Sequence, residues 1–259
     1  MEFQNKNILI TGGGSGIGKA TSMQFAVLGA NIAIIGRNPN KLMDTQKAIE
    51  AKGSSCILIV ADVSDDTMMK NAYKELSEEW NRIDVLFANA GVNGLWAPID
   101  QFPVEEWDKI HSINMRGTFL TVKYAIPLMK KNGGSIIINS SINGVSSFSK
   151  SGISGYASSK AAQVAFTRVA ALELAPYKIR VNAICPGATV SDIEDHMEVR
   201  GEESFIKWVE YPNGFSPLTG NVFADVEQVS KTVLFFAGDD AKLVTGTVLI
   251  VDGGSSLIG

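Results

Sequence analysis

The chain has 259 residues, of which 45% are hydrophobic and 19% are charged, and its formal net charge at pH 7 is −4. This composition excludes a disordered or fibrous chain and supplies enough apolar side chains for one large core. A net negative charge creates no positive electrostatic field that could hold a phosphodiester backbone, so we expect no nucleic-acid partner. No apolar run approaches the ~20 residues that cross a bilayer, and Met1–Gln4 begin no export signal. We therefore expect a soluble, cytoplasmic protein without a membrane partner.

The cysteines and histidines are too few and too scattered to predict a metal site. Cys56 and Cys185 both lie in apolar runs, which predicts small buried core residues in a reducing compartment. Two cysteines cannot form a disulfide framework or a cysteine-rich zinc site. His111 and His196 lie far apart in the sequence, so we interpret both as surface or structural residues.

Short apolar runs rich in β-branched residues recur along the chain and alternate with amphipathic stretches. The runs cover residues 7–10, 31–35, 56–60, 85–88, 135–139, 179–184 and 247–251. Nearly continuous apolar character is typical of strands that helices cover on both faces of a parallel sheet. Alternation with helices indicates right-handed βαβ crossovers. The sequence therefore predicts an α/β fold with a doubly wound, mostly parallel seven-stranded sheet of the Rossmann type.

Helix signals fill the stretches between the predicted strands. Asn38 followed by Pro39 predicts a capped helix start, and Asp225 with Gln228 predicts a capping box. One helical face is predicted from spacings of three and four residues. Its members are Met69, Ala72, Tyr73, Leu76 and Trp80.

No linker, repeat or charge block divides the chain, so we expect residues 1–259 to form a single domain. Residues 140–155 are rich in serine and glycine and predict a loop. Residues 190–220 exceed an ordinary connection and contain several aromatic residues. A segment of that length predicts a functional lid, with a peripheral insertion that only packs as the alternative.

A glycine-rich turn follows the first predicted strand and precedes a predicted helix. A pyrophosphate needs close approach to backbone N–H groups at the positive end of a helix, which side chains at Gly12 and Gly16 would obstruct. The context indicates a dinucleotide site, and the absence of a Gly-Lys-Ser/Thr ending disfavours a nucleoside triphosphatase. The residues expected to contact the cofactor here are Gly12, Ser15, Gly16, Ile17 and Gly18.

The end of the second predicted strand carries the signal for the type of cofactor. An NAD-binding unit usually has an acidic residue there, which accepts hydrogen bonds from the ribose 2′-hydroxyl. Gly36 stands at that point and Arg37 and Asn38 follow. A guanidinium pairs with a phosphate in a bidentate fork, so we predict NADP(H) as the preferred cofactor, with NAD(H) possible.

Tyr156 is followed four residues later by Lys160, which in a helix places both side chains on one face. A free phenol has a pKa of about 10, and lowering it by about 3 units requires about 4 kcal/mol of preference for the phenolate. A cation about 4 Å away in an effective dielectric of about 20 supplies about that much. The pair could therefore make Tyr156 a proton donor and acceptor.

With this pair, the chain resembles the short-chain dehydrogenases/reductases in their single-domain branch, over essentially its whole length. The resemblance rests on motifs in a fixed order. They are Thr11–Gly18, Asp62, Asn89-Ala90-Gly91, Asn114, Ser140-Ser141, Tyr156-x-x-x-Lys160, Cys185-Pro186-Gly187, Thr245-Gly246 and Val251-Asp252-Gly253-Gly254.

The resemblance implies a role for each of four catalytic residues. Tyr156 would exchange a proton with the substrate oxygen, and Ser141 would hydrogen-bond that oxygen. Lys160 would lower the phenol pKa and hold the nicotinamide ribose. Asn114 would hold a water that connects Lys160 to solvent. Ser140 is adjacent to Ser141 and is the alternative if the strand register slips.

The resemblance also implies further cofactor contacts and leaves the substrate open. The additional cofactor residues are Asp62, Val63, Asn89, Ala90, Gly91, Pro186, Gly187 and Thr189. Candidate substrate residues are Ser141 and the aromatic Trp96, Phe148, Phe205 and Trp208. Tyr156 follows Ser141 at a slightly longer spacing than the family usually has, which predicts an enlarged loop over the pocket.

We therefore expect an NADP(H)-dependent oxidoreductase that transfers hydride between the nicotinamide and a small-molecule carbonyl or secondary alcohol, with a 3-oxoacyl reductase as the first subfamily hypothesis. The Tyr–Lys spacing argues against the enoyl-reductase branch. The alternatives are an NAD-dependent alcohol dehydrogenase of the same family and a dinucleotide-binding regulatory protein without catalysis. The resemblance implies a homo-oligomer, either a tetramer or a dimer.

Overall fold

The computed structural model describes residues 3–146, 151–190, 198–201, 216–220 and 223–258. The strands and helices are, in chain order, β1 (Asn7–Thr11), α1 (Gly16–Val27), β2 (Asn31–Gly36), α2 (Pro39–Glu50), β3 (Cys56–Val60), α3 (Asp66–Glu79), β4 (Val85–Ala88), β5 (Leu95–Trp96), α4 (Val104–His111), α5 (Gly117–Met129), β6 (Gly134–Asn139), α6 (Ser154–Leu174), β7 (Ile179–Pro186), β8 (Glu198–Val199), α7 (Val226–Ala237) and β9 (Val248–Val251). A π-helical turn, Ser112–Arg116, connects α4 to α5.

Seven of the strands form one parallel sheet in the order β3-β2-β1-β4-β6-β7-β9. This arrangement confirms the predicted doubly wound α/β fold, and each strand lies within two residues of its predicted bounds. The chain builds outward from β1 to β3 and then returns to build outward from β4 to β9 on the other side. The direction of winding therefore changes between β1 and β4. A second, two-stranded sheet of β5 and β8 was not predicted, because strands of two residues leave no periodic pattern.

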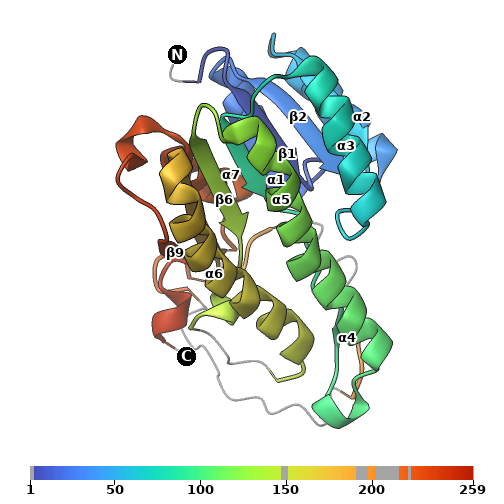
Figure 1. The fold of residues 1–259 in the computed structure, drawn as a ribbon. Coiled ribbons are helices and arrows are strands. Elements are labelled where there is room, and N and C mark those ends of the chain that lie inside the picture. Colours follow the sequence, from blue (N-terminus) through green and yellow to red (C-terminus); the bar gives the residue numbers. More distant parts are fainter. Residues whose placement is uncertain (1–2, 147–150, 191–197, 202–215, 221–222, 259) are drawn as a thin grey trace.

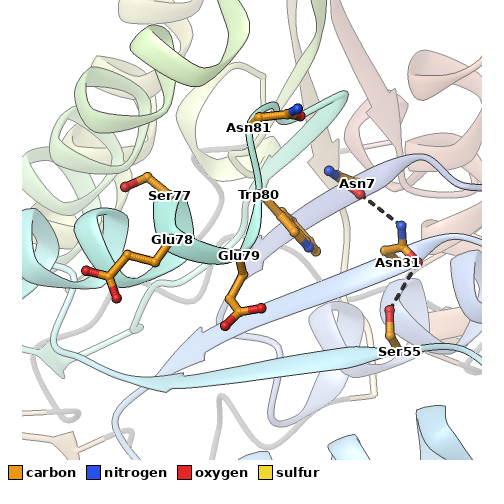
Figure 2. A pocket seen from close by; sticks show the side chains of 8 residues that line it. All are labelled: Asn7, Asn31, Ser55, Ser77, Glu78, Glu79, Trp80 and Asn81. Carbon is orange, nitrogen blue, oxygen red and sulfur yellow. Dashed lines mark hydrogen bonds between the residues drawn. The ribbon is translucent and has the colours of Figure 1, made fainter.

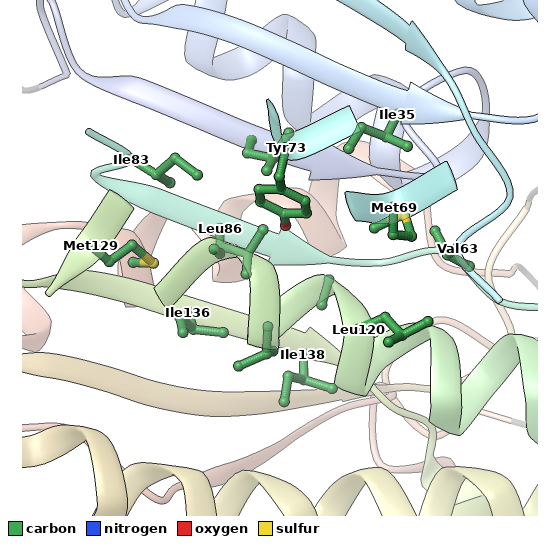
Figure 3. Packing of buried hydrophobic residues seen from close by; sticks show 14 of the residues in the cluster. Ile35, Val63, Met69, Tyr73, Ile83, Leu86, Leu120, Met129, Ile136 and Ile138 are labelled. Atoms are coloured by element: carbon green, nitrogen blue, oxygen red, sulfur yellow. The ribbon is translucent and has the colours of Figure 1, made fainter. Parts of the chain in front are cut away.

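Helices cover both faces of the large sheet, with α3, α5 and α6 on the near face in Figure 1 and α1, α2 and α7 packed on the other. Figure 3 shows the packing beneath α3 and α5, where Met69 and Tyr73 of α3 contact side chains of the sheet. The Tyr73 hydroxyl donates to the main-chain oxygen of Thr121 in α5 at 2.6 Å, so the only polar atom of this side chain is satisfied. All five residues of the predicted helical face of α3 are buried.

The helix starts that carry caps lie where the sequence places them. The Asn38 side chain accepts from the main-chain N–H groups of Asn40 and Lys41, with Pro39 in the first turn of α2. Asp225 and Gln228 form the predicted capping box at the start of α7. Each cap supplies partners for N–H groups that the first turn cannot satisfy, which fixes where the helix begins.

A row of polar side chains crosses the amino edge of the sheet at the starts of β1, β2 and β3 (Figure 2). Asn31 Nδ2 donates to Asn7 Oδ1 at 3.0 Å, and Ser55 Oγ donates to Asn31 Oδ1 at 3.0 Å. Asn7 continues the row by donating to the main-chain oxygen of Arg82, which precedes β4. The row connects four neighbouring segments at the edge opposite the carboxyl ends of the strands.

We expect Asn31→Ala to lower the free energy of unfolding by about 1–2 kcal/mol, because it removes two side-chain hydrogen bonds at a partly buried position. Urea unfolding followed by circular dichroism measures the change. Ser77→Ala, which alters an exposed side chain in the same hollow, should stay within about 0.5 kcal/mol of the unsubstituted chain. Equal losses in both variants would contradict a stabilising role for the row.

Candidate active site

A cavity of about 710 Å³ lies at the carboxyl edge of the sheet, at the change of winding direction between β1 and β4. Doubly wound sheets bind their ligands in this crevice. Eleven of the residues predicted to bind a cofactor line it. They are Gly12, Ser15, Gly16, Ile17, Arg37, Asn38, Asp62, Val63, Asn89, Ala90 and Gly91.

The glycine-rich turn is held against the end of β4 by the Asn89 side chain. Asn89 Nδ2 donates to the main-chain oxygens of Thr11 and Gly12 at 3.0 and 3.3 Å. Gly12 has φ +69°, and a Cβ there would lie 2.8 Å from Asn89 Nδ2, so a side chain would both strain the turn and displace Asn89. A Cβ at Gly18 would collide with the main-chain oxygen of Gly12, so only glycine lets α1 start this close to the turn. The turn therefore presents its backbone, together with the positive end of the twelve-residue α1, to the cavity.

Charged side chains meet at the carboxyl ends of β2 and β3. Arg37 Nη1 lies 3.7 Å from Asp62 Oδ2. Asp62 Oδ1 accepts from the main-chain N–H of Ser64 at 2.9 Å and from its hydroxyl at 2.6 Å. Val63 packs against Gly117 at the start of α5, where a Cβ would lie 2.7 Å from a Val63 methyl group. This end of the cavity thus combines one guanidinium, one carboxylate and an apolar wall.

Tyr156 and Lys160 lie in the first two turns of α6, and both are buried. Lys160 Nζ is 5.7 Å from the centroid of the Tyr156 ring. The ammonium donates to the main-chain oxygen of Asn139, at the end of β6, at 2.8 Å. Asn139 Nδ2 in turn donates to Asn89 Oδ1 at 2.8 Å. Lys160 is therefore connected through two asparagines to the glycine-rich turn.

The electrostatics of this pair differ from the sequence-based expectation. Burial raises the pKa of the Tyr156 phenol, and a hydrogen bond from the Ser141 hydroxyl only partly opposes the rise. Burial also lowers the pKa of Lys160 from 10.5 to about 8. Desolvation disfavours both charged forms, the phenolate of Tyr156 and the ammonium of Lys160. The lowered tyrosine pKa expected from Lys160 is not produced by these residues alone.

The adjacent serines point in opposite directions from the end of β6. The Ser141 hydroxyl reaches the Tyr156 phenol, and its oxygen accepts from the Asn143 N–H at 3.2 Å. The Ser140 hydroxyl donates instead to the main-chain oxygen of Lys160 at 2.8 Å, inside the core. The geometry therefore places Ser141, and not Ser140, beside the phenol.

Asn114 lies in the π-helical turn and is fully buried. Its side chain holds the segment after β4, because Oδ1 accepts from the Val92 N–H at 2.8 Å and Nδ2 donates to the Val92 oxygen at 3.0 Å. Its main-chain oxygen accepts from Gln163 Nε2 and from the Thr118 hydroxyl. A Cβ at Gly91 would lie 3.1 Å from Asn114 Oδ1 and 3.4 Å from Lys160 Nζ, so the space at Gly91 separates these two polar atoms.

The remaining predicted site residues are less closely connected to the cavity. Pro186 ends β7, the Gly187 N–H donates to the Val251 oxygen, and the Thr189 hydroxyl donates to the Gly187 oxygen. Trp96 lies in β5 and is not one of the described residues that line the cavity. Phe148, Phe205 and Trp208 lie outside the described residues, as does most of the 190–220 segment.

Sequence reasoning missed Asn139, the π-helical turn and the partner of Arg37. Asn139 had a detectable signal, because it is a polar residue directly after a buried apolar run at the carboxyl end of a strand.

His111 is satisfied structurally, since it stacks on Trp107 and hydrogen-bonds Ser158. Both cysteines are buried as free thiols. In the part of the chain that the structure describes, no helix is long and apolar enough to cross a membrane.

Comparison with known proteins places this geometry in a family. A family model described as enoyl-(acyl carrier protein) reductase matches residues 12–256. Levodione reductase of Leifsonia aquatica is 34% identical over 98% of this chain and 95% of its own length. The chain belongs to the short-chain dehydrogenase/reductase family. It is an oxidoreductase of that family, whose members among its relatives are named for reactions at alcohol and carbonyl groups.

Solved structures of short-chain dehydrogenases/reductases share the fold over 98% of the chain. A 3-ketoacyl-ACP reductase from Sinorhizobium meliloti 1021 is 40% identical with a TM-score of 0.93, covering 98% of this chain and 100% of that one. An NAD⁺-bound xylitol dehydrogenase is 30% identical with a TM-score of 0.87, covering 98% of this chain and 100% of that one.

The buried Lys160 ammonium generates a stability prediction. The pKa of Lys160 is about 8 in the folded chain and 10.5 ordinarily, so between these values the unfolded chain binds more protons. The unsubstituted chain should therefore gain about 3 kcal/mol relative to Lys160→Met as the pH rises from 7 to 10.5. Urea unfolding at a series of pH values measures the difference. Replacing the exposed Lys123 by Met is the control; parallel curves for the unsubstituted chain and Lys160→Met would contradict the prediction.

Proposed function

We propose that this short-chain dehydrogenase/reductase is an NADP(H)-dependent enzyme that transfers hydride between the nicotinamide and a carbonyl or secondary alcohol. The observation that carries the proposal is the buried contact between Ser141 and Tyr156, one helical turn from Lys160 and joined to the glycine-rich turn through Asn139 and Asn89. Groups for proton transfer and for dinucleotide binding thus belong to one connected site. This arrangement disfavours a regulatory protein that only binds the dinucleotide.

The roles of the residues follow from their surroundings. The bound nicotinamide supplies or accepts the hydride. In the reducing direction Tyr156 donates its phenolic proton to the substrate oxygen, and burial keeps this proton in place until it is needed. Ser141 donates a hydrogen bond to the same oxygen as negative charge develops on it. The Lys160 ammonium donates one N–H to the main-chain oxygen of Asn139 and keeps two further N–H donors, which suit ribose hydroxyls.

Return of a proton to Tyr156 completes the cycle. Asn114 Oδ1 and Lys160 Nζ both approach the open space at Gly91. Asn114 Oδ1 accepts one hydrogen bond from Val92 and has a second acceptor position. We propose that a water between these two atoms relays the proton. Pro186, Gly187 and Thr189 would hold the nicotinamide at the ends of β7 and β9.

The choice of cofactor rests on Arg37. Its side chain is 56% exposed at the cavity, where a 2′-phosphate could pair with it. The ion pair with Asp62 favours the second candidate, use of NAD(H), because it partly neutralises Arg37. Two of the similar solved structures, a xylitol dehydrogenase and a carveol dehydrogenase, hold NAD.

The substrate class is supported by similarity alone. The 3-ketoacyl-ACP reductase structure and a 3-oxoacyl-[acyl-carrier-protein] reductase of Thermotoga maritima at 32% identity favour a 3-oxoacyl compound. Trp96, together with residues 148, 205 and 208 outside the described part, stays our proposal for the substrate pocket, under a lid formed by residues 190–220.

We further propose that the chain is one cytoplasmic domain that assembles as a dimer or tetramer. Apolar side chains on the outer faces of α5 and α6 support assembly, since Phe119, Val169 and Leu172 are 44%, 55% and 79% exposed. A second copy of the chain packed on α5 and α6 would cover these side chains.

Tyr156→Phe tests the proposed chemistry. The variant should lose at least a hundredfold in kcat for NADPH-dependent reduction of a 3-oxoacyl thioester or simple ketone, because it removes the proton donor. Its dissociation constant for NADPH, measured by fluorescence titration, should stay within about threefold, since the ring keeps its shape. Retained turnover would reject the role of Tyr156.

In the unsubstituted enzyme, kcat/KM should be higher with NADPH than with NADH; the reverse ratio would reject the cofactor preference.

Replacement by alanine should have different effects at Ser140 and at Ser141. Ser141→Ala should lower kcat by about 10²–10³-fold with little change in stability, as loss of an oxyanion donor does. Ser140→Ala should lower the free energy of unfolding by about 1 kcal/mol, because it leaves the Lys160 carbonyl without this donor, and should retain most of the activity. Steady-state kinetics and urea unfolding of both variants measure the difference, and an exchange of the two outcomes would contradict the assignment.

A further inference from the structure

Arg37 and Asp62 form an ion pair inside the proposed cofactor cavity, where both side chains line the wall at the ends of β2 and β3. The two partners are held unequally. Asp62 Oδ1 accepts two hydrogen bonds from Ser64, whose main-chain oxygen accepts from Arg116 Nη1 at 2.7 Å. The ion pair itself, at 3.7 Å, is longer than a hydrogen bond. The carboxylate is therefore fixed, and the guanidinium is the partner that can turn away.

A 2′-phosphate and the Asp62 carboxylate offer the same chemistry to Arg37. Both are oxyanions that pair with the planar fork of a guanidinium, and one guanidinium cannot face both squarely. A cofactor with a 2′-phosphate must draw Arg37 from Asp62 and must also accept the carboxylate as a like charge nearby. A cofactor with a 2′-hydroxyl leaves the ion pair intact.

We propose that Asp62 limits the preference for NADP(H) by competing with the 2′-phosphate for Arg37. This role rests on the proposed function and adds a specificity-determining residue to it. The fixed carboxylate keeps NAD(H) usable, and the movable guanidinium makes NADP(H) the better cofactor. The ion pair thus sets the ratio of kcat/KM with NADP(H) to kcat/KM with NAD(H).

Asp62→Asn tests the competition, because the amide oxygen can still accept from Ser64 while the negative charge is lost. The ratio of kcat/KM with NADPH to kcat/KM with NADH should rise about two- to fivefold, the range expected for an exposed ion pair. Any contact of Asp62 that both cofactors share cancels in this ratio. A binding readout without catalysis is the affinity for adenosine 2′,5′-bisphosphate relative to AMP, measured by titration calorimetry, which should rise by a similar factor.

Two further variants show whether the effect passes through Arg37. In an Arg37→Gln background the increase caused by Asp62→Asn should be smaller, because the competition has been removed. Asp66→Asn removes an equal charge from a residue of the neighbouring helix that does not line the cavity, and it should leave the ratio unchanged.

Each outcome decides between the inference and the proposed function. A ratio that is unchanged or lower in Asp62→Asn, or an increase just as large in the Arg37→Gln background, would overturn the role of Asp62 alone, provided that the unsubstituted chain binds both nucleotides. If the unsubstituted chain binds neither adenosine 2′,5′-bisphosphate nor AMP, the proposed cofactor site itself is overturned together with this inference.

Discussion

The site depends on how a buried ammonium is held. Lys160 has one described protein acceptor, the main-chain oxygen of Asn139, and that residue is tied through Asn89 to the glycine-rich turn. Asn89 gives its amide hydrogens to two turn carbonyls, so its oxygen must face Asn139, and the orientation of the second amide follows. The position of the lysine and the shape of the turn are thereby two ends of one chain of hydrogen bonds. The ammonium takes its partner from the end of β6, and the side chains of Asn139 and Asn89 join that strand end to the turn.

The features that sequence reasoning predicted are those set by local physics. Buried parallel strands are apolar along their whole length, so the seven runs were visible without any knowledge of pairing. The caps at Asn38 and Asp225 act on N–H groups two or three residues away. Glycine at positions 12 and 18 reflects the approach of backbone to backbone, which forbids a Cβ. Ser140 and Ser141 directly follow β6, and the serine beside the phenol is Ser141, the one that the resemblance to the family predicted.

The features that escaped prediction depend on residues far apart in sequence. The Arg37–Asp62 pair joins the ends of two strands, and Asn139 contacts Asn89 across the sheet. The pKa of Tyr156 could not be derived from its spacing to Lys160, because i and i+4 fix a helical face and say nothing about burial. Desolvation opposes both the phenolate and the ammonium, so the pair by itself favours the neutral phenol. Proximity in sequence gave the partners correctly but gave the wrong sign for the net effect on the pKa.

The π-helical turn at Ser112–Arg116 has a consequence for how this chain can vary. Such a turn holds one residue more than an α-helical turn and breaks the regular ladder between α4 and α5. Removing a single residue there would restore a straight helix, yet it would rotate everything on one side by about 100° relative to the other. Asn114 would then lose its two side-chain hydrogen bonds with the main chain of Val92, which hold the segment after β4. Insertions and deletions are ordinarily tolerated best in surface loops. In this chain, a deletion in the π-helical turn would disrupt the contacts that hold the site.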